Sequence, residues 1–322
     1  MSGVGLILTI LGGGSAVLLA ALAVLIARRG LQERAATQAE ARGEAFRAAL
    51  LPHLLDPSGE PDRALAAWSH DPCALGVSTH LLALLRGNER GRVLALIERL
   101  ELVHAPLARL RHSPRRSVRL AAIREVAAIE LGLVRDTLTE AMRRDRALEV
   151  RLEAALALIR QGVTPPLEQT CAWLEDGAGL ASPAHRIVLR AIAAARPAEM
   201  LAAWHGGRAG PARLALADAL GSVSTRAALA ALTAALRDPE PQMRCEALRA
   251  LRRVAHPLAA GAIVAALDDE EWIVRVQAAS AAGALGLQTA VPRLAALRSD
   301  SHWWVRYRAD EALAVLALKE AA

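Results

Sequence analysis

One unit recurs three times, at a spacing of 31 residues, between Thr225 and the end of the chain. Its three copies contain the segments "RDPEPQMRCEALRAL", "DDEEWIVRVQAASAAGAL" and "SDSHWWVRYRADEALAVL". In each copy an aspartate is followed six residues later by an arginine: Asp238 and Arg244, Asp269 and Arg275, Asp300 and Arg306. A period of roughly 20–50 residues is typical of stacked supersecondary elements. The repeat therefore predicts an array of similar pieces.

Each copy contains two apolar segments with helical character. Residues Val274, Ala278, Ala281 and Leu285 recur at helical spacing after the aspartate, and "LAAGAIVAAL" precedes it. Apolar residues make up 54% of the chain, but there is only one Phe and one Tyr. Leu and Ala, which dominate instead, are strong helix formers. One-sided helix pairs bury their apolar faces by stacking on neighbouring pairs, so we predict an all-α solenoid.

The D-x5-R pattern, the nearby tryptophans and the "A-x-x-A-L-G" ending resemble HEAT-like repeats of the phycobilisome-lyase type. Weaker copies toward the N-terminus contain Arg119, Arg151, Arg186 and Arg213. The intervals between successive arginines are 32, 35, 27, 31, 31 and 31 residues, so the middle, from about Gly162 to Pro211, departs from the family pattern. The resemblance implies a HEAT-like solenoid over residues 111–322, with divergent repeats or a cap over residues 56–110. We expect about eight helix pairs in a right-handed stack.

The aspartates and arginines of the repeats have matching chemistry. The planar guanidinium of arginine can bind a carboxylate with two hydrogen bonds, either within one repeat or between neighbours. We interpret these residues as a structural ladder: Asp145, Arg151, Asp238, Arg244, Asp269, Arg275, Asp300 and Arg306.

The N-terminal segment from Val4 to Ala27 contains no charged residue. About 20 apolar residues suffice to cross a bilayer as a helix, so we predict a single transmembrane helix at residues 4–27 within an anchor at 1–29. The glycines at 12–14 could form a close-approach face for another helix or could simply be tolerated in lipid.

The residues after this segment set the expected orientation. Arg28, Arg29 and Arg34 follow the apolar stretch, and positive charge favours the cytoplasmic side. We therefore predict a single-pass protein of the cytoplasmic (inner) membrane, with the solenoid on the cytoplasmic side. Residues 30–55 are expected to form a charged juxtamembrane helical linker.

Motifs of catalytic or metal sites are missing from the sequence. It contains no HExxH, no His-Glu dipeptide, no GxSxG and no phosphate-binding loop followed by GK[ST]; His70-Asp71 is the nearest approach to a His-acid dipeptide. The three cysteines show no CxxC spacing. We therefore predict no catalytic residue, no metal ligand and no cofactor. A lyase or hydrolase site in the concave groove remains an alternative.

The charge of the chain gives little support to nucleic-acid binding. The net charge is +6, and Lys319 is the single lysine among 39 basic residues. This arginine bias, with abundant alanine, indicates the coding bias of a GC-rich bacterial genome. Phosphate-binding surfaces concentrate charge on one face, whereas many of these arginines occupy ladder positions. We predict no nucleic-acid partner, and a nucleic-acid-binding HEAT-like protein is the less favoured alternative.

Three tryptophans lie at the same turn of adjacent repeats: Trp272, Trp303 and Trp304. Such rings beside arginine are typical anchors of protein interfaces, but they could also pack between repeats. We expect Trp304 to occupy the apolar position and Trp303 to be the more exposed ring. The sequence thus predicts a membrane-tethered, non-catalytic scaffold or regulatory subunit that binds a protein, such as a membrane protein or membrane enzyme complex. It leaves the oligomeric state open.

Overall fold

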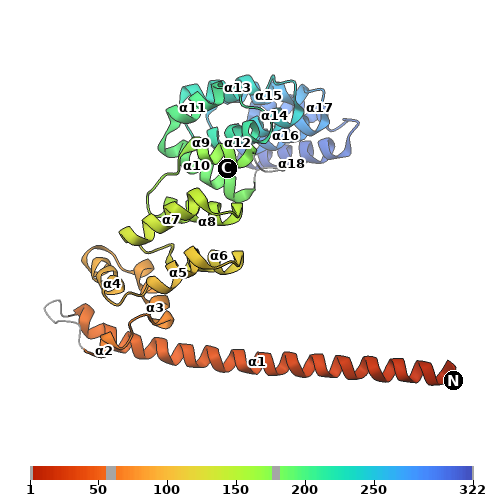
Figure 1. Ribbon diagram of the computed structural model, residues 1–322. Helices are drawn as coiled ribbons and strands as arrows, with labels where there is room; N and C mark the ends of the chain where they lie inside the picture. Colours follow the sequence, from red (N-terminus) through yellow and green to blue (C-terminus); the bar gives the residue numbers. More distant parts are fainter. Residues whose placement is uncertain (1–2, 56–62, 176–181, 321–322) are drawn as a thin grey trace. The chain divides into compact units, whose positions relative to one another are not determined.

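The computed structural model describes residues 3–55, 63–175 and 182–320 (Figure 1). All regular secondary structure in these residues is helical. The chain divides into two compact units, Met1–Val134 (unit 1) and Arg135–Ala322 (unit 2). The all-α class predicted from the sequence is therefore confirmed for the described residues.

Unit 1 begins with one long helix and continues with shorter helices. Their bounds are α1 (Gly3–Leu55), α2 (Arg63–Ala66), α3 (Pro72–Leu84), α4 (Gly87–Arg99), α5 (His104–His112) and α6 (Arg116–Val126). Helix α1 runs without a break through the predicted boundary between residues 29 and 30. The last part of α1 contacts α3. Its side chains Phe46 and Leu50 are fully buried, and the ring centres of Phe46 and Trp68 lie 5.4 Å apart.

The predicted membrane anchor is not supported by the structure. Within the described residues, no helix offers an apolar stretch long enough to cross a membrane. The described side chains of the apolar segment begin at Leu22, and Arg28 follows six residues later, whereas a span needs about 20 apolar residues. The predicted single-pass location in the inner membrane is contradicted by this finding. Most of the predicted span, residues 4–21, lies outside the residues whose side chains are described.

Unit 2 is a series of short helices. Their bounds are α7 (Gly132–Arg144, which begins at the end of unit 1), α8 (Leu148–Arg160), α9 (Leu167–Glu175), α10 (Pro183–Ala195), α11 (Pro197–His205), α12 (Gly210–Leu220), α13 (Arg226–Ala235), α14 (Pro241–Val254), α15 (Ala260–Ala265), α16 (Trp272–Leu285), α17 (Val291–Leu297) and α18 (Trp303–Glu320). Short 3-10 turns flank α15 and precede α17. In chain order, α9 contacts α10, α11 contacts α12, α13 contacts α14, α15 contacts α16 and α17 contacts α18.

The helices of unit 2 form two layers (Figure 1). Helices α8, α10, α12, α14, α16 and α18 contact one another in this order, and each of α11, α13, α15 and α17 packs on the helix that follows it. This is the stacking of helix pairs that the 31-residue period predicts.

The buried positions of the last repeats follow the predicted apolar stripe. Val305, Ala309, Ala312 and Leu316 are at most 3% exposed, and Val274, Ala278 and Ala281 are buried as well. A Cβ added to Gly283 would lie 2.9 Å from the Cα and 3.0 Å from the Cβ of Ala312. Small residues therefore allow α16 and α18 to approach closely.

Candidate functional site

Three repeat arginines of unit 2, Arg213, Arg244 and Arg275, pair with the aspartate of the following repeat, 25 residues later. The distances are 2.6 Å for Arg213–Asp238, 2.9 and 2.8 Å for Arg244–Asp269, and 2.8 and 3.1 Å for Arg275–Asp300. The last two pairs are bidentate, with both carboxylate oxygens accepting from one guanidinium. Consecutive repeats are thus joined by partly buried ion pairs.

The spacing of six residues within each repeat reflects a different contact. Arg275 Nη1 donates to the backbone carbonyl of Asp269 at 2.8 Å, and Arg306 Nη1 donates to that of Asp300 at 2.8 Å. The Asp300 carboxylate in turn accepts from the backbone N–H of His302 at 2.8 Å. The aspartate therefore organises the turn before the second helix, and the arginine links this turn to the next one.

The ladder electrostatics favour the ionised pairs. Burial would raise the pKa of Asp300, but the hydrogen bonds and charge of Arg275 and the backbone N–H of His302 hold it below its usual value. The hydrogen bonds to Asp269 raise the pKa of Arg244, against the effect of its own burial. Both effects come from fixed partners in a partly dry environment.

The repeat of Asp145 and Arg151 keeps the turn contact of this pattern, because Asp145 accepts from the backbone N–H two residues later, as Asp300 does. Arg151 lies over the Trp173 ring at 5.5 Å, and Asp145 accepts from the backbone N–H of Ala147 at 2.8 Å. The residue 25 positions after Arg151 is Asp176, which lies outside the described residues.

A cluster that the sequence analysis missed joins α10, α12 and α14. We call it the Asp218 cluster; it contains the buried carboxylates of Asp218 and Glu246 and the guanidinium groups of Arg186, Arg190, Arg249 and Arg253. Arg190 binds Asp218 at 2.8 and 2.7 Å, Arg253 binds it at 2.6 Å, and Arg186 bridges Asp218 (3.3 Å) and Glu246 (2.9 Å). Four cations and two anions (4 − 2) leave a formal surplus of two positive charges.

The carboxylate of Asp218 is ionised despite its burial. Burial raises its pKa, but the Arg190 hydrogen bonds and the charges of Arg253 and Arg186 outweigh this effect and hold the pKa below the usual value. The sequence contains a pattern that could have indicated this cluster. Asp218 is the one acid of the apolar helix α12, and α10 and α14 each carry two of the cluster arginines four residues apart.

Aromatic side chains gather where α16 and α18 begin. We call Trp272, His302, Trp303, Trp304 and Tyr307 the aromatic cluster. Trp272 stacks on His302 with ring centres 3.9 Å apart and planes 6° apart, and so links two adjacent repeats. Trp303 stacks on Trp304 at 4.2 Å, and Tyr307 meets both rings edge-on at 5.8 and 6.1 Å.

The structure brings the three predicted tryptophans to one exposed region. The exposed fractions are 37% for Trp272, 51% for Trp303 and 43% for Trp304. The prediction that Trp304 fills the apolar position is wrong, because the neighbouring Val305 is fully buried and takes that place. Sequence reasoning also missed Tyr307, which is 49% exposed and one helical turn after Trp303.

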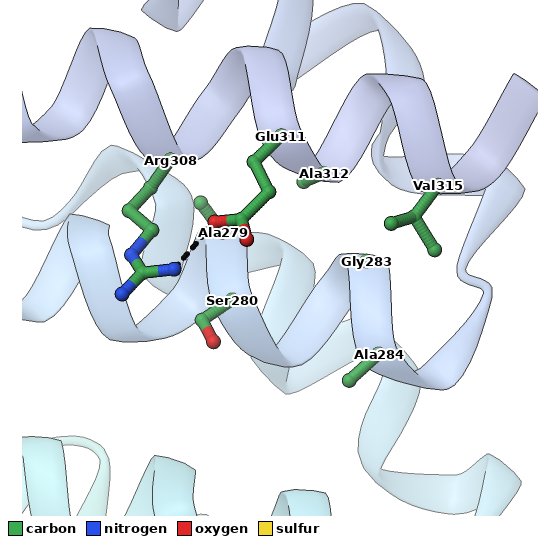
Figure 2. Close-up of a pocket in the computed structure, with 8 residues that line it drawn as sticks. All are labelled: Ala279, Ser280, Gly283, Ala284, Arg308, Glu311, Ala312 and Val315. Atoms are coloured by element: carbon green, nitrogen blue, oxygen red, sulfur yellow. Dashed lines mark hydrogen bonds and ion pairs between the residues drawn. The ribbon is translucent and has the colours of Figure 1, made fainter.

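Two open pockets lie in the same unit. One, of about 180 Å³, lies between α16 and α18 and is lined by Ser280, Gly283, Arg308, Glu311 and Val315 among others (Figure 2). Arg308 and Glu311 form an ion pair at its side. The second, of about 370 Å³, lies along α13 and reaches Leu258.

The titratable side chains of unit 1 include one group at metal-ligand distances. Among the described residues, His70, Glu101 and His104 place three ligand atoms within 4.8 Å of one another. Among the described residues, none of the three cysteines belongs to a group at metal-ligand distances. Cys171 and Cys245 are buried, Cys73 is half-buried, and all three are reduced thiols.

Comparison with known families identifies the repeat type. A family model described as HEAT repeats matches residues 229–314. This segment consists of HEAT repeats. It includes the two bidentate ladder pairs and the aromatic cluster, so these features belong to the HEAT part of the chain.

Solved structures share the fold at low sequence identity. The crystal structure of Kap121p aligns with a TM-score of 0.54 and 15% identity over 86% of this chain and 36% of Kap121p. Human deoxyhypusine hydroxylase in complex with glycerol aligns over 88% of this chain and 98% of its own, at 20% identity, but with a TM-score of only 0.34. No curated protein matches the sequence significantly. The likeness to Kap121p shows a helical repeat fold alone.

Proposed function

We propose that this HEAT-repeat protein is a non-catalytic scaffold or regulatory subunit that binds another protein through the aromatic cluster. HEAT repeats typically serve to bind protein partners, and residues 229–314, which include the aromatic cluster, match such repeats. The D-x5-R pattern supports the closer assignment to the phycobilisome-lyase type of repeat as part of the same proposal.

The observation that carries the proposal is the exposure of four large rings at the starts of α16 and α18. Trp272, Trp303, Trp304 and Tyr307 are each more than one third exposed, although Val274 and Val305 on the same helices are fully buried. Rings that only packed between repeats would be expected to lose most of their exposed surface. Trp and Tyr are enriched among the residues that dominate binding energy in protein interfaces.

The cluster is also ordered before any partner binds. The Trp303–Trp304 stack and the Trp272–His302 stack restrain the rings, so little side-chain entropy would be lost on association. Arg308 lies 5.8 Å from the centre of the Tyr307 ring and adds a charged residue at the edge of the aromatic surface. An apolar centre with a polar rim is the usual anatomy of such an interface.

Site-specific photocrosslinking in cells of the native host tests this proposal. A photoreactive amino acid is placed at position 303, and in a matched control at position 187, where Ile187 on α10 has a similar exposed fraction of 49%. We expect one protein to be crosslinked reproducibly from position 303 and not from 187.

Substitutions then test the contribution of the rings. Trp303→Ala with Trp304→Ala should abolish recovery of that protein while the circular dichroism spectrum is retained, and Ile187→Ala should recover it at the wild-type level. Equal recovery by the double variant, or crosslinking to the same protein from both positions, would contradict the proposal.

A further inference from the structure

Unit 1 contains two loops whose polar side chains converge. One loop precedes α3 and contains His70; the other connects α4 to α5 and contains Glu101, and His104 follows it as the first residue of α5. His70 Nε2 lies 3.4 Å from Glu101 Oε2, and His104 Nδ1 lies 3.7 Å from the same oxygen. The three ligand atoms therefore form a compact triangle around the carboxylate.

The size of this triangle fits a zinc ion. Zinc binds histidine nitrogen and carboxylate oxygen at about 2.0–2.2 Å with tetrahedral geometry, and the edge of such a tetrahedron is about 3.3–3.6 Å. Two sides of the triangle, at 3.4 and 3.7 Å, are close to this edge length, and the third, between the two histidine nitrogens, is within 4.8 Å. Two imidazoles and one carboxylate are a known donor set for zinc, with water as a fourth ligand.

The backbone holds both loops in an unusual conformation at the ligands. His70 has φ 61° and Glu101 has φ 55°, and Ala255 is the one other non-glycine residue with positive φ in the described part of the chain. Glycine is the usual residue in this left-handed region, because a side chain is sterically disfavoured there. Strained positions of this kind gather at ligand-binding sites.

The left-handed backbone conformation of Glu101 is part of the motif that ends helix α4. The backbone N–H of Leu102 donates to the carbonyl of Ile97, and that of Glu101 to Glu98, as in a Schellman motif at the end of α4. Glycine is preferred at the position that Glu101 occupies. A carboxylate stands there instead, while the flanking Leu100 and Leu102 are buried.

The two loops are tied together independently of any ion. The backbone N–H of His70 donates to the carbonyl of Leu100 at 3.1 Å. The three side chains are half exposed, at 56%, 55% and 50%, so an ion can reach them from solvent. The C-terminus of α4 and the N-terminus of α5 meet at this site, and their opposite dipole ends offset each other.

We propose that His70, Glu101 and His104 bind one Zn²⁺ ion, which clips the loop before α3 to the loop between α4 and α5. The ion has a structural role in unit 1: it compensates for the two left-handed ligand residues by coordinating their side chains. The site is separate from the aromatic cluster, so it does not depend on the function proposed for that surface.

Isothermal titration of the full chain with ZnCl₂, after removal of any purification tag, tests this inference. The wild-type protein should bind one equivalent of zinc, and zinc should raise its melting temperature. Loss of an outer hydrogen-bond partner of a metal ligand typically weakens binding about 10–100-fold, and removal of a ligand should do at least as much. His70→Ala and His104→Ala should therefore each raise the Kd by at least about tenfold.

Glu101→Gly is the most informative variant. Glycine relieves the left-handed conformation, so the zinc-free protein should melt at the same temperature as wild type or higher, while zinc binding is lost. Two exposed histidines of unit 1 outside the triangle serve as controls: His80→Ala and His112→Ala should bind zinc with the wild-type Kd. Absence of zinc binding by the wild type, or undiminished binding by Glu101→Gly and His70→Ala, would overturn the proposal.

Discussion

Removal of the Arg244 side chain should be among the most destabilising single changes in the stack. Its guanidinium donates to both oxygens of Asp269 at 2.9 and 2.8 Å, and to the carbonyls of Asp238 and Pro239 at 2.9 and 3.3 Å. The side chains of Arg244 and Asp269 are only 6% and 12% exposed. Arg244→Ala would leave this nearly buried carboxylate with a backbone donor, the N–H of Glu271, as its remaining partner among the hydrogen bonds described for it.

The expected magnitude follows from this burial. Breaking a buried pair by removing one partner costs about 3–5 kcal/mol, because the other charge is left uncompensated. An exposed pair is worth about 0–1 kcal/mol. For a unit of this size, 3–5 kcal/mol corresponds to a decrease in melting temperature of roughly 6–20 °C.

Urea denaturation and thermal melting followed by circular dichroism provide the assay. The matched control is Arg298→Ala, because Arg298 pairs with Asp310 at a similar 2.8 Å but the two side chains are 63% and 57% exposed. Arg298→Ala should change the free energy of unfolding by no more than about 1 kcal/mol. Arg244→Lys keeps the charge but not the planar fork, so its loss should be intermediate. Similar small losses for Arg244→Ala and Arg298→Ala would refute the structural role of the ladder.

Two further stability predictions rest on close packing and on ionised carboxyl groups. Gly283→Ala should lower the free energy of unfolding, because the new Cβ would lie 2.9 Å from Ala312 Cα. Gly261 has open space around it, so Gly261→Ala should raise the free energy of unfolding by about 0.5–1 kcal/mol. Equal effects of the two substitutions in chemical denaturation would contradict the role of close helix approach. Three carboxyl groups have pKa values held below their usual range by arginine partners or backbone donors despite burial: Asp218, Asp238 and Asp300. Since the unfolded chain binds more protons than the folded one in this range, the stability from these groups is complete above about pH 5 and is lost as the pH falls through about 4 and below. Asp218→Asn should reduce the steepness of this loss in a series of melting curves, and an unchanged pH dependence would show that the cluster does not contribute.

The sequence was sufficient for features that repeat with a fixed period. The 31-residue spacing of Arg244, Arg275 and Arg306 predicts stacked helix pairs, because each repeat must place equivalent residues in equivalent surroundings. The same regularity places the next aspartate 25 residues after an arginine, which is the pairing in the structure. The apolar stripe could likewise be located from helical spacing.

The irregular contacts depended on tertiary structure. Arg186 has the sequence position of a ladder arginine, but it pairs with Asp218 and Glu246, because neighbouring helices supply carboxylates at other positions. Helical spacing placed Val305 on the apolar stripe, but the sequence analysis also gave Trp304 an apolar position, and of these two residues the structure buries only Val305.

The chain by itself therefore determined the helical class, the repeat and its stacking, since these follow from local periodicity and from the need to bury one apolar face. Only the tertiary structure brought His70 beside Glu101 and His104, because 30 residues of intervening chain separate His70 from Glu101, and the backbone hydrogen bond from His70 to Leu100 depends on how the helices pack. It also assembled the aromatic cluster from two successive turns. Contacts between side chains of different loops depend on how the helices pack, and this packing is a property of the whole fold.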